Sequence, residues 1–350
     1  MKEFRAFVSA DTDKYHNFPR AQASFNVTVQ RSFNRFRFFR KAHGHWQRGD
    51  LHVPYDTYHK LRDYSPDLIL SVQLGLRTAL ATVYRRRHRK AKLILWATLS
   101  RHTEEDRNWI RNALRRWIVR RIDGAFVNGK GGEEYLRLLG YTGRVHTIPY
   151  AIDDAPFRSD VYDPREGVLR LIYAGHLVPQ KGVRRFCTVL NEWCAAHPEI
   201  AVHLAIAGEG PEERAIRTMP AESNLSIALY RPMPQEQLAT HYRQADLFVF
   251  PTLGDEWGVV VNEAMIAGLP VLGSIYSQAV LELVEEGVNG WQFDARDAKS
   301  MYAGLDRAFA CGVDRLYEMS SNAQERIAQI SPAAVASNAV RAMKTIAAQD

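Results

Sequence analysis

The chain has 350 residues, of which 46% are hydrophobic and 24% are charged. This composition is typical of a folded globular protein and excludes disordered and fibrous chains. The length favours two domains over one. The net charge of +7 and the isoelectric point of about 9.3 favour anionic partners, such as nucleotide phosphates, anionic lipid or nucleic acid.

The sequence has three irregularly spaced cysteines, Cys187, Cys194 and Cys311. An odd, irregular set predicts neither a disulfide framework nor a zinc site, so we expect buried free thiols in a reducing compartment. Neither a signal-peptide pattern nor the ~18 uninterrupted apolar residues of a spanning helix is evident. These features predict a cytoplasmic protein.

Short strand-like runs of apolar residues alternate with longer helical stretches. In the first half, strands are expected at residues 4–10, 67–72, 93–97, 125–128 and 145–149. In the second half, strands are expected at residues 169–174, 202–207, 226–230, 247–251 and 270–273, and helices at residues 183–197, 212–219, 236–245 and 259–267. Several runs are apolar on both faces, which is typical of parallel strands covered by helices on both sides. The predicted fold class is therefore α/β with parallel sheets.

Residues 150–170 combine prolines, a glycine and several aspartates without a clear period, which indicates a linker. We therefore expect an N-terminal domain at residues 1–155 and a C-terminal domain at residues 156–330, with a ligand cleft between them. Residues 331–350 begin with Ser331-Pro332, a helix cap followed by proline in the first turn. They are predicted to form a helix that crosses back to the N-terminal domain.

A strand followed by a glycine-containing turn occurs twice in the second half. The first strand ends at Gly175 and His176, and a short loop then carries Lys181 and Gly182 into a helix. The second is followed by Gly208-Glu209-Gly210-Pro211. Ligands of open α/β sheets bind at such strand ends, where glycine permits close approach of the backbone and lysine can neutralise phosphate. An ordinary turn with a solvated lysine is the alternative interpretation.

The loop after residue 251 is the richest in polar groups. Asp255 and Glu256 lie in this loop. Gly258 and Val259 then open a helix, and Glu263 lies more than a turn inside it. The unpaired N–H groups of a helix start can bind a diphosphate, and an inward-facing glutamate can accept hydrogen bonds from a pair of sugar hydroxyls.

These motifs, in this order, resemble the retaining glycosyltransferases of family 4 (glycosyl transferases group 1). That family has the GT-B architecture, in which two Rossmann-like domains with parallel sheets face a cleft. The resemblance covers residues 145–310 well and residues 1–144 loosely. Its remaining elements are Ile148-Pro149 with Asp153, Glu263-Ala264-Met265, Gly268-Leu269-Pro270-Val271 and Glu286-Gly287-Val288-Asn289-Gly290.

The resemblance implies roles for individual residues. Lys181 would bind the diphosphate of a nucleotide-sugar donor, and His176 stands where most relatives have a phosphate-binding arginine. The family's two glutamates, eight positions apart, map to Asp255 and Glu263. Glu263 would hold the ribose hydroxyls. Asp255 would contact the donor sugar as a catalytic group, a contact that Glu256 could share or take over.

Further residues complete the substrate-binding set that the resemblance implies. The amides of Gly258 and Val259 would meet the phosphates or the sugar, and Gly175 and Glu209 belong to the glycine turns. Arg231 stands where relatives often have glycine near the base-binding loop. It either adds a phosphate contact, changes the choice of base, or is a surface arginine.

The implied reaction is transfer of a sugar, with retention, to a glycan or lipid-linked acceptor of a cell-envelope polysaccharide. Lys181 and the helix start would stabilise the departing diphosphate, so no metal or other cofactor is expected. Two departures from the family stand out. The N-terminal domain is expected to lack the family's first strand, because residues 4–10 resemble the second. The family's histidine after the strand at residues 93–97 is not evident, and Thr98 or His102 stands in that area.

Two basic segments favour a peripheral position on the inner face of the membrane. One is the cluster from Arg85 to Lys92, and the other is the amphipathic stretch from Trp109 to Ile118. Basic residues near an anionic surface contribute about 1 kcal/mol each. The alternative is that the apolar face of the second segment packs on the sheet.

Other functions remain alternatives to the transferase. The main alternative is a degenerate relative that binds a nucleotide sugar without turnover. A nucleotide-sugar epimerase would need acid and base groups across the cleft, and nucleic-acid binding rests on charge alone. Asp11-Thr12-Asp13 matches the metal-binding DxD of single-domain transferases, but the two-domain pattern argues against that fold.

Overall fold

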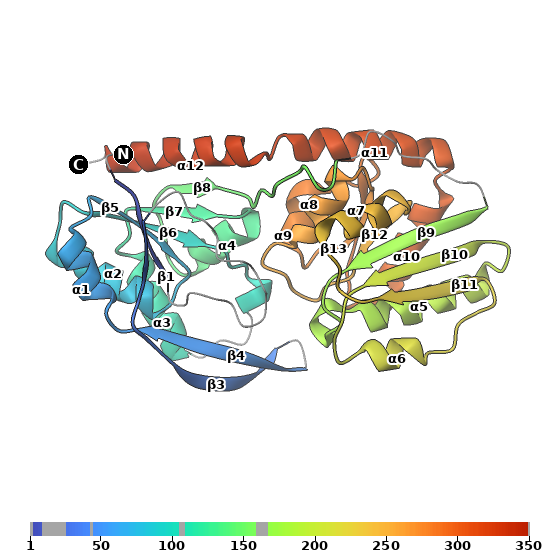
Figure 1. Ribbon diagram of the computed structural model, residues 1–350, viewed down its shortest axis with the longest axis horizontal. Coiled ribbons are helices and arrows are strands. Elements are labelled where there is room, and N and C mark those ends of the chain that lie inside the picture. Colours follow the sequence, from blue (N-terminus) through green and yellow to red (C-terminus); the bar gives the residue numbers. More distant parts are fainter. Residues whose placement is uncertain (1–2, 9–25, 43–44, 105–108, 159–166, 349–350) are drawn as a thin grey trace.

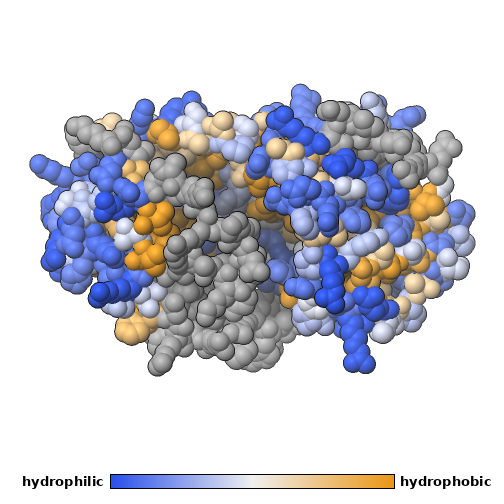
Figure 2. Space-filling model, in the orientation of Figure 1, coloured by the Kyte–Doolittle hydropathy of each residue, from blue (hydrophilic) through white to orange (hydrophobic). Residues whose placement is uncertain are grey.

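The computed structural model describes residues 3–8, 26–42, 45–104, 109–158 and 167–348. Two α/β lobes lie side by side along the long axis, and two long helices cross one edge of both lobes (Figure 1). Where this face is coloured by hydropathy, hydrophilic residues predominate and hydrophobic residues form smaller areas (Figure 2). Asp11-Thr12-Asp13 lies outside the described residues.

The N-terminal lobe is built on a four-stranded parallel sheet in the order β5-β6-β7-β8. Its strands are β5 (Leu68–Val72), β6 (Lys92–Ala97), β7 (Gly124–Val127) and β8 (Val145–Thr147). The helical elements of this lobe are α1 (Thr57–Tyr64), α2 (Leu76–Arg87), η1 (His102–Glu104), α3 (Trp109–Val119) and α4 (Lys130–Leu138).

Four further strands stand apart from this sheet. A parallel pair joins β1 (Arg5–Val8) to β2 (Asn26–Val29), and β3 (Ser32–Ala42) forms an antiparallel hairpin with β4 (His45–Pro54). The strand expected at residues 4–10 is thus β1, and among the described residues it pairs with β2 alone. Phe7 of β1 nevertheless packs against the core of the lobe.

The C-terminal lobe holds a six-stranded parallel sheet in the order β11-β10-β9-β12-β13-β14. Its strands are β9 (Val168–Ala174), β10 (Ala201–Ala207), β11 (Leu225–Tyr230), β12 (Leu247–Phe250), β13 (Val271–Ser274) and β14 (Gly290–Phe293). All residues of β12 and β13 are buried, because helices cover both faces of the sheet centre. The helical elements are η2 (Pro179–Lys181), α5 (Val183–Ala196), α6 (Glu213–Arg217), α7 (Gln235–Arg243), α8 (Val259–Ile266), α9 (Gln278–Leu283) and α10 (Ala298–Ala310).

Two helices after α10 lie along the edge of the molecule. α11 (Val313–Ala328) covers the C-terminal lobe, and α12 (Pro332–Ala347) continues over the N-terminal lobe (Figure 1). Ala342 and Ile346 of α12 are buried against Ile94 and Phe126 of the N-terminal sheet. A Cβ atom on Gly124 would lie 2.4 Å from Cδ1 of Ile346, so glycine lets the helix approach the sheet closely.

The strands and helices expected in the C-terminal half occur within about two residues of their predicted bounds, and β14 is an additional strand. The N-terminal half differs more, because β2 and the β3–β4 hairpin were not expected. The thiols of Cys187 and Cys194 are buried, and burial raises their pKa to about 12 and about 11. Cys311 is only half-buried, contrary to expectation.

Candidate functional site

The strand order of the C-terminal sheet reverses between β9 and β12. β10 and β11 extend the sheet to one side of β9, and β13 and β14 extend it to the other side of β12. At such a reversal the loops after the two central strands diverge, and ligands bind in the crevice between them. Here those loops are residues 175–182 after β9 and residues 251–258 after β12.

Glycines allow these loops to approach one another closely. Gly182 has a φ of +68°, and a Cβ atom on it would lie 2.1 Å from the carbonyl oxygen of Pro251. A Cβ atom on Gly208 would lie 1.9 Å from the carbonyl oxygen of Gly175. Larger residues are therefore excluded at both positions, and backbone lines this edge of the sheet.

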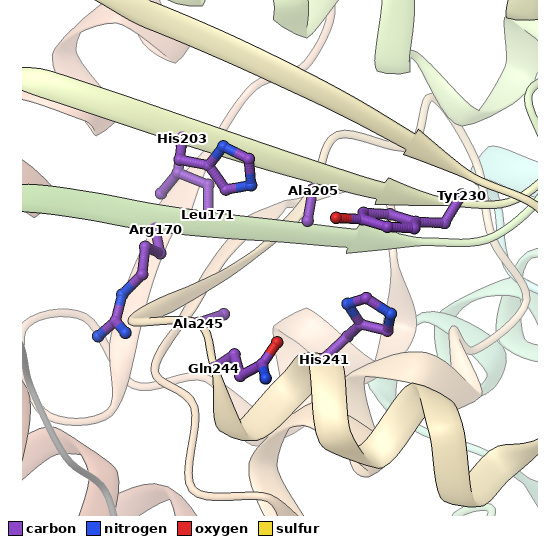
Figure 3. Close-up of a pocket in the computed structure, with 8 residues that line it drawn as sticks. All are labelled: Arg170, Leu171, His203, Ala205, Tyr230, His241, Gln244 and Ala245. Carbon is purple, nitrogen blue, oxygen red and sulfur yellow. The ribbon is translucent and has the colours of Figure 1, made fainter.

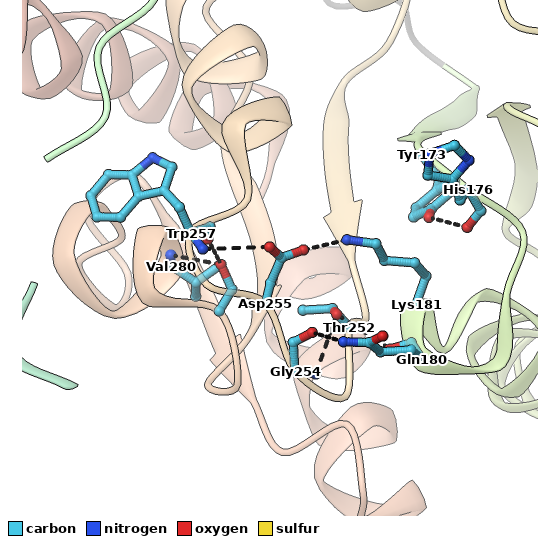
Figure 4. A network of polar contacts seen from close by, with 10 residues as sticks. Tyr173, His176, Gln180, Lys181, Thr252, Gly254, Asp255, Trp257 and Val280 are labelled. Carbon is cyan, nitrogen blue, oxygen red and sulfur yellow. Dashed lines mark hydrogen bonds and ion pairs between the residues drawn. The ribbon is translucent and has the colours of Figure 1, made fainter. Parts of the chain in front are cut away.

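Lys181 and Asp255 come from the two diverging loops and form an ion pair (Figure 4). Both side chains are partly exposed, at 23% and 16%, so a ligand can still reach the ammonium group. The other carboxylate oxygen of Asp255 accepts a 3.4 Å hydrogen bond from the Trp257 amide. Asp255 therefore links the lysine to the chain entering α8.

The start of α8 requires glycine. Gly258 has a φ of +102°, and a Cβ atom there would lie 2.6 Å from the Phe250 ring. Among the described residues, no side chain caps this helix start, and its first turn has no acidic residue. The exposed Val259 follows directly. The positive end of the helix is therefore available to an anion beside Lys181.

Glu256 faces the N-terminal lobe instead of the ion pair. Its Oε2 accepts hydrogen bonds from the Thr98 hydroxyl at 3.2 Å and from the Gln73 amide at 3.5 Å. Burial is the main cause that raises the pKa of this carboxyl group to about 7, the negative charges of Glu104 and Asp255 contribute to the rise, and the two hydrogen bonds oppose it. Glu256 is thus a carboxyl group between the lobes that titrates near neutral pH.

Glu263 lies in α8, about one turn after the helix begins at Val259. Its carboxylate accepts a 3.0 Å hydrogen bond from the hydroxyl of Tyr242 in α7. Burial raises the pKa of Glu263, and the tyrosine hydrogen bond partly offsets that rise. Burial also raises the pKa of Tyr242, as does the neighbouring Glu263 charge. Among the contacts of the described residues, none joins Glu263 directly to Lys181 or Asp255.

The remaining predicted residues surround this edge without joining the ion pair. Gly175 follows β9 directly, and its N–H donates to Ala207 of β10. The side chains of His176, Glu209 and Arg231 are exposed at the ends of β9, β10 and β11. The structure thus brings Lys181, Asp255 and the start of α8 together, and the exposed side chains of His176, Glu209 and Arg231 lie at the edge of this site.

Sequence reasoning missed two polar partners of the site. Gln73 has a φ of +69°, unusual for a residue other than glycine, and its side chain also donates to Thr98. Gln278 of α9 is buried and donates a 2.8 Å hydrogen bond to the carbonyl oxygen of Glu256. Neither residue stands in a motif, so no signal in the sequence identifies them. His102 packs its ring edge-on against Tyr276 and does not contact Glu256 among the described interactions.

A cavity of about 270 Å³ lies elsewhere, between one face of the C-terminal sheet and α7 (Figure 3). Its lining includes His203, Tyr230, His241 and Gln244, and none of the predicted site residues. Arg170 at one end is paired with Asp246. This cavity is therefore distinct from the crevice at the strand ends.

The amphipathic segment from Trp109 to Ile118 forms α3 and is buried at one end only. Ile118 is buried in the core of the N-terminal lobe, whereas Trp109 and Ile110 are 77% and 60% exposed. Arg115 is buried and paired with Glu104, and Arg85 of the first basic cluster is paired with Asp123. None of the helices in the described ranges has the length and apolar character needed to cross a bilayer.

Comparisons with known proteins identify a family that the C-terminal lobe resembles. Residues 169–310 match the family described as Glycosyl transferases group 1. A putative colanic acid biosynthesis glycosyltransferase, WcaL, of Salmonella typhimurium is 30% identical over 169 residues, which are 46% of this chain and 41% of the relative. The chain thus spans about two fifths of the length of the curated relatives it matches first.

Solved structures share the fold across both lobes. The lipopolysaccharide outer core galactosyltransferase WaaB superposes with a TM-score of 0.67 at 15% identity, covering 83% of this chain and 78% of that one. Anabaena Alr3699/HepE, in complex with UDP-glucose, superposes with a TM-score of 0.63 at 16% identity, covering 85% and 83%. The overall fold is therefore GT-B, with the sheets of the two lobes facing a cleft.

Proposed function

We propose that this chain, whose residues 169–310 form a glycosyl transferases group 1 domain, transfers a sugar from a nucleotide-diphosphate donor to a glycan or lipid-linked acceptor, with retention. The observation that carries the proposal is the meeting of Lys181, Asp255 and the start of α8 where the strand order reverses. A relative named for colanic acid biosynthesis and a structural neighbour named as a lipopolysaccharide outer core galactosyltransferase support this class of reaction.

The donor diphosphate is proposed to lie between Lys181 and the amide end of α8. On donor binding, the ammonium group exchanges its Asp255 partner for phosphate oxygens, because a diphosphate carries more negative charge than one carboxylate. The helix start adds a fixed positive potential where charge develops on the leaving group. His176 and Arg231, exposed at the rim, are proposed to add weaker contacts to the nucleotide.

The carboxyl groups of the loop and of α8 are proposed to orient the sugars of the donor. Asp255, released from Lys181, contacts the transferred sugar, and Glu263 accepts hydrogen bonds from the ribose hydroxyls. Tyr242 holds the Glu263 carboxylate in place for that role. Glu256 faces the cleft from the same loop and is proposed to contact the sugar or acceptor there. Positioning of this kind lowers the entropic cost of reaching the transition state.

A lipid-linked acceptor would place the chain at a membrane surface, and α3 supports that position. Trp109 and Ile110 expose apolar surface on the same helix as the exposed Arg116, which suits the interface of an anionic bilayer. Arg86, Arg89 and Lys90 at the end of α2 are also exposed. The proposed membrane partner is therefore an anionic lipid surface, contacted by the N-terminal lobe.

A panel of nucleotide sugars, tested for thermal stabilisation, examines the donor site directly. A donor present at 100 times its Kd should stabilise the fold by about 2.7 kcal/mol and raise the melting temperature. Glu263→Ala should abolish the shift, whereas Glu325→Ala, an exposed glutamate on α11, should keep it. If no donor shifts the wild-type protein, the proposal is wrong.

Product analysis separates transfer from binding. The wild-type protein with a stabilising donor should release free nucleoside diphosphate, slowly by hydrolysis and faster with an acceptor, and NMR should show the anomeric configuration of the donor in the product. A protein that binds donors without any release is instead a nucleotide-sugar-binding module.

A further inference from the structure

We propose that Glu282 and Gln278 of α9 are positioning residues that clamp the start of α4 and so hold Gln73 and Thr98 against Glu256. The clamp joins the two lobes of the molecule through side chains of one lobe and backbone N–H groups of the other. Its effect on sugar transfer rests on the proposed function, whereas the contact itself does not.

The first half of the clamp is a carboxylate on a helix start. Oε1 of Glu282 accepts a 2.6 Å hydrogen bond from the Lys130 amide, the first residue of α4. A Cβ atom on Gly129 would lie 2.6 Å from Cγ of Glu282. A side chain at position 129 would therefore displace Glu282, a residue about 150 positions later in the other lobe.

The second half of the clamp is the buried amide of Gln278. Its oxygen accepts a 3.1 Å hydrogen bond from the Gly132 amide in the first turn of α4. Its nitrogen donates to the carbonyl oxygen of Glu256 at 2.8 Å and approaches that of Leu99 at 3.5 Å. One side chain thus contacts α4, the loop after β6 and the loop that carries Glu256.

The physical reason for the clamp lies in the start of α4. Gly129 has no side chain to cap the helix, and among the described contacts the Lys130 amide donates to Glu282 of the other lobe. A carboxylate is the preferred partner at the positive end of a helix, and the charge strengthens its hydrogen bond. Glu282 can accept the hydrogen bond from the Lys130 amide only while the two lobes are in contact. Capping of α4 therefore depends on the relative position of the lobes.

The clamp lies beside the contacts that Glu256 makes across the cleft. Gln278 holds the backbone of Glu256, while the side chain of Glu256 reaches Thr98 and Gln73. Lys181 and Glu263, the proposed donor contacts, belong to the C-terminal lobe alone. Releasing the clamp should therefore weaken the approach of the N-terminal residues and leave nucleotide binding unchanged.

Amide hydrogen exchange tests the contact without a substrate. Glu282→Ala should speed exchange of the Lys130 amide roughly tenfold or more. Glu282→Gln should stay closer to wild type, because its amide oxygen can still accept the bond. Glu285→Ala is a matched control, since this nearby glutamate is exposed, and it should change nothing. Unchanged Lys130 exchange in Glu282→Ala would overturn the proposal.

A double-variant comparison tests whether Gly129 and Glu282 touch in solution. Gly129→Ala should also speed Lys130 exchange, because the added methyl group displaces the glutamate. In the Glu282→Ala background the same change should add less than about twofold. If the two effects multiply as independent changes, the lobes are not clamped in this way.

Steady-state kinetics of Glu282 variants test the effect of the clamp on sugar transfer. Glu282→Ala should lower kcat about tenfold while the Kd for the nucleoside diphosphate stays within twofold, and Glu282→Gln should recover much of kcat. An equal loss in nucleotide affinity would contradict a positioning role. If no donor is turned over by any variant, the proposed function fails, and the exchange data still decide the clamp.

Discussion

The hydroxyl of Thr98 donates a 3.2 Å hydrogen bond to Oε2 of Glu256, a residue 158 positions later in the other lobe. Gln73 donates to the same oxygen at 3.5 Å, so two strand ends of the N-terminal sheet converge on one carboxyl group. Burial of that group between the lobes raises its pKa to about 7. Protonation of Glu256 is therefore coupled to the contact between the lobes.

The stability of the fold should depend on pH through Glu256. The folded protein holds this proton up to about pH 7, whereas the unfolded chain releases it near the ordinary pKa of 4.5. The stability contributed by the raised pKa is therefore fully present below pH 4.5 and is lost as pH rises through 7. Compared with Glu256→Gln, the wild-type protein should lose on the order of 3 kcal/mol over this interval. Urea denaturation of both proteins at pH 5 and pH 8 measures the difference.

A matched change at an exposed carboxyl group provides the control. Glu285→Gln should follow the wild-type pH dependence, because the side chain of Glu285 is exposed. Parallel stability curves for wild type and Glu256→Gln would mean that Glu256 is not buried between the lobes in solution.

Lys181 should contribute to nucleotide binding. Replacing it with alanine removes the ammonium group and leaves Asp255 near the phosphate position without its partner. We expect Lys181→Ala to weaken the binding of a nucleoside diphosphate about tenfold to thirtyfold, which corresponds to about 1.4–2 kcal/mol. Calorimetric titration measures this affinity, and Lys299→Ala, at an exposed lysine, should leave it unchanged.

Gly258 should tolerate no side chain. Gly258→Ala would combine an unfavourable positive φ with a methyl group 2.6 Å from the Phe250 ring. The expected loss is about 2–4 kcal/mol in the free energy of unfolding. Gly312→Ala serves as the control, because nothing lies within 4 Å of a Cβ atom there, and its unfolding should change little. Equal stability of the two variants would show that the turn before α8 is not held as described.

The exposed end of α3 should bind anionic membranes. The double variant Trp109→Ser with Ile110→Ser removes the exposed apolar surface and should reduce binding to phosphatidylglycerol vesicles about tenfold or more. Leu138→Ser, an equally exposed apolar residue on α4 of the same lobe, should have no effect. Vesicle cosedimentation at low and high salt measures both variants. If the double variant binds the vesicles as well as the wild-type protein does, α3 does not contribute to membrane binding.

The order of strands and helices in the C-terminal lobe could be predicted from the sequence, because buried parallel strands leave continuous apolar runs between helical stretches. The motifs that contain Lys181, Asp255 and Glu263 follow predicted strands, so the sequence also predicted that these residues lie near the ends of those strands. The β3–β4 hairpin was not predicted, and β1 proved to pair with β2 instead of joining the main sheet. Strand partners depend on distant segments, so local periodicity does not determine them.

The sequence by itself determined which side chains are available at the strand ends and that glycines would allow the backbone segments there to pack closely. Only the tertiary structure decided that Glu256 turns away from Asp255 toward Thr98, and that Glu282 caps α4. Both contacts join residues more than 150 positions apart, and each depends on how the two lobes are placed. That placement results from packing and helix capping between lobes, including α12 on the N-terminal sheet, and no local pattern of residues encodes it.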